Sequence, residues 1–515
     1  MMAGAGSSGS RRALRLVAGR SGEVGVVDGS DPGRRRRGVA PKLGLLSLVA
    51  ATFFVVSGGP YGLEEIISSY GYHRALLLLL FVPLVWSLPI ALIVGEMSST
   101  LPQEGGYYAW VRRAMGPFWG MQVAWVALAM SLFDMAIYPT LLVTYLGRLV
   151  PALQDTSVGG AGWLAGVAMI ALCALWNLRG SRSVGEGSII LGAVLLLPFV
   201  VLIGCAAVKI WHLDAGTLAR QFTDVPEGAA GQGVGGSVIV TGVLLCMWNY
   251  MGWDNASTVA AEVDRPQRTY PKAMALTVLL VAACYVLPVL FAAASGMPAS
   301  AWTAGAWVDV GRRLGGPLLA TAIAVGGALC GLGMFNMLIL AYSRLPLAMA
   351  HDGLLPAWLG VCSKRSGAPT RIILISALLY AACMGLGFRR LVEIDVILYG
   401  VAIALQFVAL FVLRIREPNL VRPFRIPGGL VGVALLVSLP LGLLGLAMWA
   451  GRNEPGMWGL SGLQIGALIA LCGPLVYGLR SAVRWVARHP VAPADRTPAA
   501  AATASASSSA ALSVR

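Results

Sequence analysis

The sequence predicts an all-α polytopic membrane protein with twelve transmembrane helices in a five-plus-five inverted repeat. Three observations lead to this prediction. Hydrophobic residues make up 57% of the 515 residues and charged residues only 12%, about half the charged share of a soluble domain. Twelve apolar stretches approach or exceed the roughly 20 residues that a helix needs to cross a bilayer. The first and sixth stretches contain helix-breaking residues at corresponding places in the two halves.

The apolar stretches define one membrane domain, expected over residues 39–488. They lie at residues 42–69, 75–99, 116–148, 161–177, 187–208, 235–261, 273–294, 318–343, 371–388, 394–413, 431–450 and 459–482. Because each repeat has an odd number of helices, the second repeat is inverted, and two helices follow it. Residues 1–38 are rich in Gly, Ser and Arg, and residues 489–515 consist mainly of Ala, Ser and Pro. We expect both tails to be disordered because neither holds enough apolar surface to fold alone.

The Lys and Arg residues indicate the orientation of the domain. With the N-terminus in the cytoplasm, the inner loops hold more Lys and Arg than the outer loops, and both tails are basic. We therefore expect both termini in the cytoplasm and the protein in the cell membrane. Much of the net charge of +15 belongs to this bias, so it does not indicate nucleic-acid binding.

The sequence shows no pattern typical of an enzyme or a metal site. The four His residues fall in loops or tails, and the eight Cys residues lie mostly within apolar stretches without metal-ligand spacing. No constellation of nucleophile, base or metal ligands lies near the bilayer. We therefore expect neither a cofactor nor enzymatic activity.

The two interruptions are the most informative part of the sequence. SGGPYGLEE at residues 57–65 places Gly-Gly-Pro inside the first apolar stretch, and WNYMGWDN at residues 248–255 lies inside the sixth. A helix in lipid has to satisfy its own backbone hydrogen bonds, so a break survives only where protein buries it or where it lines a wet cavity. Two interrupted helices at corresponding positions predict the binding site of a secondary transporter.

Acidic residues within the apolar stretches need a role, because a carboxylate at mid-membrane costs about 2.5–3.5 kcal/mol on insertion scales. Asp134 lies in the third stretch, with Tyr138 one helical turn later on the same face. It either braces two helices through backbone donors or contacts substrate or a proton. Asp254 lies beside Trp253 in the second interruption, where unwound backbone, an acid and an aromatic ring favour a ligand contact.

Two other acidic positions allow more than one interpretation. Asp395 opens the tenth stretch, with Tyr399 one turn later, and is either a helix-start residue at the membrane surface or a site residue. Glu64 and Glu65 follow the first interruption. There a vestibule-facing or helix-packing position is favoured over a central ligand.

The charge balance of the apolar core favours a cationic ligand. No Lys or Arg lies near the middle of a stretch in the two repeats, so an acidic cavity has no internal counter-charge. Tyr138, Tyr250, Trp253 and Tyr399 are candidates for cation–π contacts with ammonium groups. These residues predict a transporter of organic cations.

Several stretches resemble the amino acid–polyamine–organocation superfamily, over about residues 40–485. The segment at residues 96–107 followed by GPFWG is typical of the superfamily, and SGGPYGLEE, SRLPLAMAHDGLLP and LRIREPNLVRPFRIPGG are similar to it. The segments MWNYMGWDN and SLFDMAIYPT indicate a particular branch of the superfamily. They are similar to the branch that holds plant-type polyamine uptake transporters and L-type amino acid transporters.

The resemblance implies a leucine-transporter-like fold with broken helices 1 and 6, and alternating access to a central site between spans 1, 3, 6, 8 and 10. Carried onto this chain, it implies substrate contacts from Ser57, Gly58 and Gly59 at the first break and from Asn249 through Asp254 at the second. An amino acid would place its carboxylate on half-helix N-termini and its amine on freed carbonyls. A polyamine would need acids spaced along the cavity, for which the aspartates of the third and sixth stretches are candidates.

The resemblance also implies coupling to protons. Around residues 331–342 the eighth stretch lacks the paired Ser and Thr hydroxyls of a sodium site, and the fifth stretch has no Lys before Lys209. An acid would then carry the proton, and the candidates are Asp134 and Glu64.

The leading hypothesis is therefore proton-coupled uptake of polyamines or related organic cations. The alternative keeps the same fold with neutral or cationic amino acids as substrate, by symport or exchange. A channel agrees less well with two inverted broken helices, which suit an occluded site better than a continuous pore.

Overall fold

The computed structural model describes residues 42–224, 237–384, 388–451 and 461–488. All helices described here belong to one unit that begins at Lys42. The tails predicted at residues 1–38 and 489–515 lie outside the described residues. The described part is helical, and its β-type pairing is limited to one isolated bridge between Leu43 and Val263.

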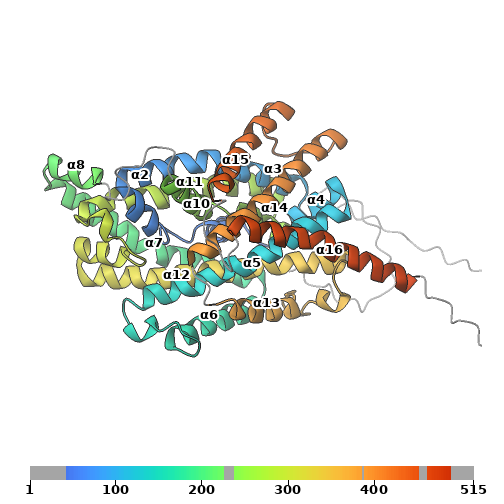
Figure 1. Cartoon of the computed structure of the whole chain (residues 1–515), viewed down its shortest axis with the longest axis horizontal. Coiled ribbons are helices and arrows are strands. Elements are labelled where there is room, and N and C mark those ends of the chain that lie inside the picture. Colours follow the sequence, from blue (N-terminus) through green and yellow to red (C-terminus); the bar gives the residue numbers. More distant parts are fainter. Residues whose placement is uncertain (1–41, 225–236, 385–387, 452–460, 489–515) are drawn as a thin grey trace, which may run out of the picture. The chain divides into compact units, whose positions relative to one another are not determined.

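The helices follow one another along the chain in the order labelled in Figure 1. The α-helices are α1 (Leu45–Val56), α2 (Glu64–Val85), α3 (Ser87–Thr100), α4 (Tyr107–Met115), α5 (Pro117–Leu146), α6 (Ala161–Asn177), α7 (Ser181–Trp211), α8 (Ala215–Thr223), α10 (Ser237–Asn249), α11 (Pro266–Ala292), α12 (Trp307–His351), α13 (Thr370–Ala382), α14 (Phe388–Arg416), α15 (Gly429–Gly451) and α16 (Gly462–Arg488). The 3-10 helices are η1 (Pro151–Gln154), η2 (Trp253–Glu262), η3 (Ala293–Ser295), η4 (Ala299–Ala301) and η5 (Ala357–Gly360).

Eight helical segments of the described residues are long and apolar enough to cross a membrane. They are Glu64–Thr100, Pro117–Leu146, Ser181–Trp211, Pro266–Ser295, Trp307–His351, Ile394–Arg416, Gly429–Trp449 and Gly462–Ser481. Helices also occupy the remaining predicted stretches, but α1 and α10 end at the interruptions, and α6 and α13 have only 17 and 13 residues. The chain is therefore a polytopic all-helical membrane protein, with twelve spans remaining a prediction.

The first interruption separates α1 from α2. Its backbone turns through Gly58, Gly59 and Gly62, whose positive φ angles of 65°, 106° and 93° are strained for other residues. Gly58 also leaves no room for a Cβ, which would lie 2.5 Å from a methionine sulfur of α12. Trp307 donates from Nε1 to the carbonyl oxygen of Pro60 at 2.9 Å, which ties the turn to the start of α12.

The second interruption begins where α10 ends, at Asn249. Gly252 has a φ of 95° and lies so close to α1 that a Cβ would overlap with the carbonyl oxygen of Val55. Beyond it the chain continues as η2. Leu43, before α1, pairs with Val263, just after η2, in the isolated bridge. The two interruptions therefore lie side by side although they are far apart in sequence.

Long helices surround this pair of interruptions. α1 packs against α7, α11 and α12, and α10 packs against α2, α14 and α15. α5 lies beside both α12 and α14 (Figure 1). The helices that carry Asp134 and Asp395 are therefore neighbours close to the two breaks.

A buried ion pair joins α3 to α14. The guanidinium group of Arg414 donates to both carboxylate oxygens of Glu96, at 3.0 and 2.5 Å. The backbone N–H of Ile426 donates to the same carboxylate at 2.8 Å. The side chains of Arg414 and Glu96 are 2% and 0% exposed. Because an unpaired buried charge is costly, this pair fixes the end of α14 against α3.

Candidate functional site

A small cavity lies between the two interruptions. Its walls are formed by Val55, Val56, Ser57, Tyr61, Asp134, Tyr138, Leu141, Trp248, Asn249, Met251, Gly252, Asn255, Tyr285, Met334 and Tyr342. No basic side chain is among these lining residues. The cavity measures about 20 Å³, which is room for about one water molecule. A larger ligand therefore enters only after the helices move apart.

Asp134 lies on α5 with its carboxylate facing the cavity, where two tyrosines hold it. Tyr138 donates from its hydroxyl to Oδ1 at 2.6 Å, as its position one turn later on α5 predicts. Tyr342, on α12, donates to Oδ2 at 3.0 Å. Asn255 donates in turn to the hydroxyl of Tyr342 at 3.4 Å. Asp134 thus joins α5, α12 and η2 and remains in contact with the cavity.

Asp254 is buried in the first turn of η2 behind the second interruption. Gln406 of α14 donates to its Oδ2 at 2.7 Å, and the hydroxyl of Tyr399 interacts with the same carboxylate. The hydroxyl of Tyr399 accepts from the N–H of Gly252 at 3.0 Å. Trp253 points its Nε1–H at a backbone carbonyl 2.9 Å away and is fully buried. Asp254, Trp253 and Tyr399 therefore lie beside the cavity rather than in its wall.

Asp395 lies deeper in the protein than a helix-start position would place it. α14 begins at Phe388, so Asp395 lies about two turns inside the helix, and its side chain is 0% exposed. Its carboxylate interacts with the indole of Trp248, which lines the cavity. It is close enough to Asp134 for the two carboxyls to interact electrostatically. The surface interpretation of Asp395 is therefore wrong.

Glu64 does not line the cavity but is buried among residues next to it. It accepts hydrogen bonds from the hydroxyl of Tyr145, from the N–H of Gly62 at 2.7 Å and from the N–H of Gly305 at 3.3 Å. The ring of Tyr61, which does line the cavity, packs on Tyr145 with centroids 4.8 Å apart. Glu64 therefore joins the first interruption, α5 and the segment before α12.

The predicted backbone contacts are partly engaged within the protein. Ser57 accepts at its hydroxyl from the N–H of Gly59 at 3.1 Å. The N–H of Gly58 makes only a long hydrogen bond, 3.3 Å, to a carbonyl oxygen of α1. The carbonyl oxygen of Asn249 accepts from Tyr285 at 2.8 Å.

The structure places some predicted residues in the cavity wall and others behind it. Ser57, Asp134, Tyr138 and Asn249 line the cavity, whereas Gly58, Gly59, Glu64, Trp253, Asp254 and Tyr399 do not. The sequence did not identify two residues that donate hydrogen bonds to the aspartates. Tyr342 of α12 donates to Asp134, and Gln406 of α14 donates to Asp254. No signal in the sequence around either residue distinguishes it from a packing residue.

The chain is similar to known permeases over most of its length. A sequence model of the family described as amino acid permease matches residues 46–458. The polyamine transporter RMV1 of Arabidopsis thaliana is 33% identical over 454 residues, covering 87% of this chain and 89% of the relative. The polyamine transporter PUT1 of Oryza sativa subsp. japonica is 31% identical over 461 residues, covering 86% and 80%.

A bacterial relative is more distant. The low-affinity putrescine importer PlaP of Escherichia coli (strain K12) is 25% identical over 389 residues, covering 72% of this chain and 78% of the relative. The family match includes both interruptions and the helices that surround them. The chain therefore belongs to the amino acid permease family, within the amino acid–polyamine–organocation superfamily, and is a membrane transporter rather than an enzyme.

Proposed function

We propose that this transporter takes up polyamines or related organic cations by proton symport. The main support is a group of three buried carboxylates, Asp134 in the cavity wall and Asp254 and Asp395 outside it, with no basic side chain among the lining residues. The buried arginines of the described residues, Arg344 and Arg414, are paired with glutamates elsewhere. Carboxylates buried without counter-charge are costly, so this site favours a ligand with several ammonium groups. The names of the two plant relatives and of the putrescine importer support the same class of substrate.

In the proposed complex, one ammonium group lies between Asp134 and Asp395. Two buried carboxylates side by side repel each other, so either a proton or an ammonium group has to lie with them. A second ammonium group lies at Oδ1 of Asp254, because Gln406 already donates to Oδ2. The rings of Tyr138 and Tyr399 flank the methylene chain and contribute cation–π attraction, with Trp253, Asn249 and the backbone of residues 57–59 completing the site.

Transport in this proposal proceeds by alternating access in a twelve-helix domain with a five-plus-five inverted repeat. The contacts of Glu64 with Tyr145 and Gly305 lie next to the cavity, and substrate entry requires their release. The proton travels on Asp134 or on Glu64. Both termini lie in the cytoplasm, and the protein acts in the plasma membrane.

An amino acid permease or exchanger is the second candidate. The family description supports it. The weakly bonded N–H of Gly58 at the first interruption is also a suitable donor for a substrate carboxylate.

Uptake into proteoliposomes tests the proposal. The full-length protein is reconstituted, and labelled spermidine, putrescine, leucine and arginine are offered with and without an imposed pH gradient. We expect spermidine and putrescine to accumulate, and to accumulate faster when the external medium is the more acidic one. Accumulation of leucine without spermidine would overturn the substrate assignment, and uptake that ignores the gradient would overturn symport.

A further inference from the structure

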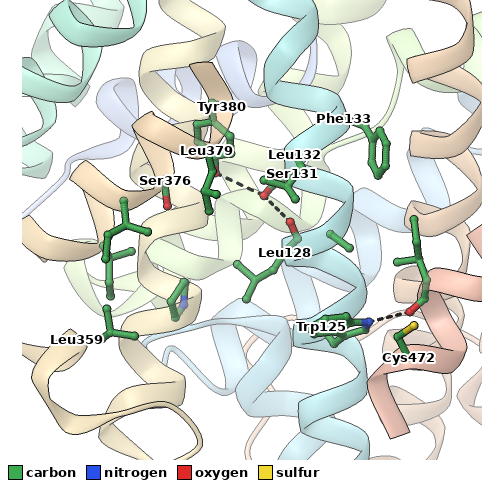
Figure 2. A pocket seen from close by; sticks show the side chains of 15 residues that line it. Trp125, Leu128, Ser131, Leu132, Phe133, Leu359, Ser376, Leu379, Tyr380 and Cys472 are labelled. Atoms are coloured by element: carbon green, nitrogen blue, oxygen red, sulfur yellow. Dashed lines mark hydrogen bonds between the residues drawn. The ribbon is translucent and has the colours of Figure 1, made fainter. Parts of the chain in front are cut away.

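A second cavity, larger than the one between the interruptions, lies elsewhere in the described residues. It measures about 430 Å³ and is bounded by α5, α12, α13 and α16. Figure 2 shows Leu128 and Leu132 of α5 facing Leu379 and Tyr380 of α13, with Trp125 beside α16. Its volume lies within the range of about 300–1,000 Å³ that is typical of small-molecule sites. We call this cavity the lateral groove.

The lateral groove opens where the helices are exposed and apolar. On α13, Leu378 and Leu379 are 73% and 50% exposed, and on α16 Leu471 and Leu475 are strongly exposed as well. In a membrane protein such surfaces face lipid chains. α5 separates the groove from the central cavity, since Ser131 lines the groove and Asp134 the cavity.

The polar groups inside the lateral groove already have partners. Tyr380 donates to the hydroxyl of Ser131 at 3.4 Å, and Ser131 donates to the carbonyl oxygen of Leu128 at 2.7 Å (Figure 2). Trp125 donates from Nε1 to the carbonyl oxygen of Ile469 at 2.7 Å. The remaining wall is almost entirely apolar. An apolar chain therefore suits this groove best, because it buries no polar group that would need a hydrogen-bond partner.

One end of the lateral groove is basic. Leu359 lines it, and the neighbouring Trp358 is 51% exposed. Arg371 donates to the carbonyl oxygen of Trp358 at 2.8 Å, with its guanidinium carbon 5.9 Å from the centre of the indole ring. Lys364 and Arg365 are exposed in the connection between these residues, which contains no Asp or Glu. An exposed Trp with Arg and Lys is typical of the head-group level of a membrane and attracts anionic lipid.

We propose that the lateral groove binds one acyl chain of an anionic phospholipid, whose head group lies at Arg371. The apolar wall suits the chain and the basic end suits the phosphate. A second copy of this protein fits less well, because with a net charge of +15 it brings like charge to a basic end. The groove is separate from the central cavity, so a failure of this proposal would not contradict the proposed transport function, and the reverse also holds.

Native mass spectrometry of the full-length protein in mild detergent tests this proposal. Phosphatidylglycerol and phosphatidylcholine with the same acyl chains are added in turn, and bound lipid is counted. We expect one phosphatidylglycerol to be retained several-fold better than phosphatidylcholine. Equal retention of the two lipids by the unchanged protein would overturn the proposal.

Matched variants locate the bound lipid. Leu379→Trp fills the lateral groove and should reduce retention several-fold, whereas Leu378→Trp, on the neighbouring residue outside the lining, should not. Arg371→Gln should remove the preference for phosphatidylglycerol, whereas Arg220→Gln, an exposed arginine on α8, should keep it. Equal effects within either pair, or a dimer that Leu379→Trp alone dissolves, would overturn the proposal. Because these side chains are exposed, the variants are expected to fold, and their melting temperatures check this.

Discussion

Asp395→Asn is the sharpest test of the central site because it removes the charge and keeps an oxygen that can accept a hydrogen bond. The side chain of Asp395 is 0% exposed, and its carboxylate interacts with the indole of Trp248. Asparagine has nearly the same shape, so packing is retained. The substitution also removes the repulsion between Asp395 and Asp134. The variant should therefore fold at least as well as the unchanged protein.

The expected loss of binding follows from the missing charge. An ammonium group about 4 Å from a carboxylate interacts with it by roughly 4 kcal/mol at an effective dielectric constant of about 20. Truncating one partner of a buried charge pair costs at least about 2 kcal/mol in measured complexes. Asp395→Asn should therefore weaken spermidine binding by about 2–4 kcal/mol, which corresponds to roughly a 30- to 700-fold higher Kd.

Titration calorimetry of the purified protein with spermidine measures this change, and thermal unfolding checks the fold. Glu186→Gln is the control, because Glu186 is an exposed acid on α7 that pairs with Arg182 of the same helix and does not line the cavity. It should bind spermidine as the unchanged protein does. If Asp395→Asn keeps its affinity while both variants are folded, Asp395 does not bind the substrate and the reasoning fails.

Three further predictions concern the framework around the site. Glu96→Gln strands the charge of Arg414 in the core and should cost about 3–5 kcal/mol, seen as a clear fall of Tm in detergent; an unchanged Tm would contradict the role given to this pair. Gly252→Ala should abolish spermidine uptake, because the methyl group meets a carbonyl oxygen of α1 at a φ of 95°; normal uptake would show that the second interruption tolerates displacement. At the surface, a hydrogen bond from Arg113 lowers the pKa of Glu417. Its stabilisation, at most about 1 kcal/mol, is therefore present above pH of about 4.3 and lost as the pH falls through the lowered pKa. Glu417→Gln should flatten this part of the Tm–pH profile, and an unchanged profile would contradict it.

Much of the fold was predictable because its decisive signals are local. Gly58 and Gly252 indicate breaks in apolar stretches, and both adopt the positive φ angles that favour glycine. Asp134 and Tyr138 are one turn apart on α5, so their hydrogen bond follows from helical spacing alone. The apolar stretches likewise predicted where helices lie, since a helix occupies each of them.

The rest depends on contacts between distant segments. Tyr342 and Gln406 donate hydrogen bonds to Asp134 and Asp254 from other helices, and the sequence around the two donors does not indicate these contacts. Asp395 opens the tenth apolar stretch, which suggested a helix start at the membrane surface, yet α14 begins at Phe388 and the side chain is buried. Asp254 and Tyr399 lie beside the second interruption but behind the cavity wall, a difference that only packing decides.

The central claim is that buried carboxylates at two adjoining helix breaks bind an organic cation. An electron cryo-microscopy structure of the full-length protein with spermidine tests it most directly. We expect ammonium groups within hydrogen-bond distance of Asp134 and Asp395, in a cavity wider than the present 20 Å³. Spermidine located away from all three aspartates, or absent from a folded protein at saturating concentration, would contradict the account.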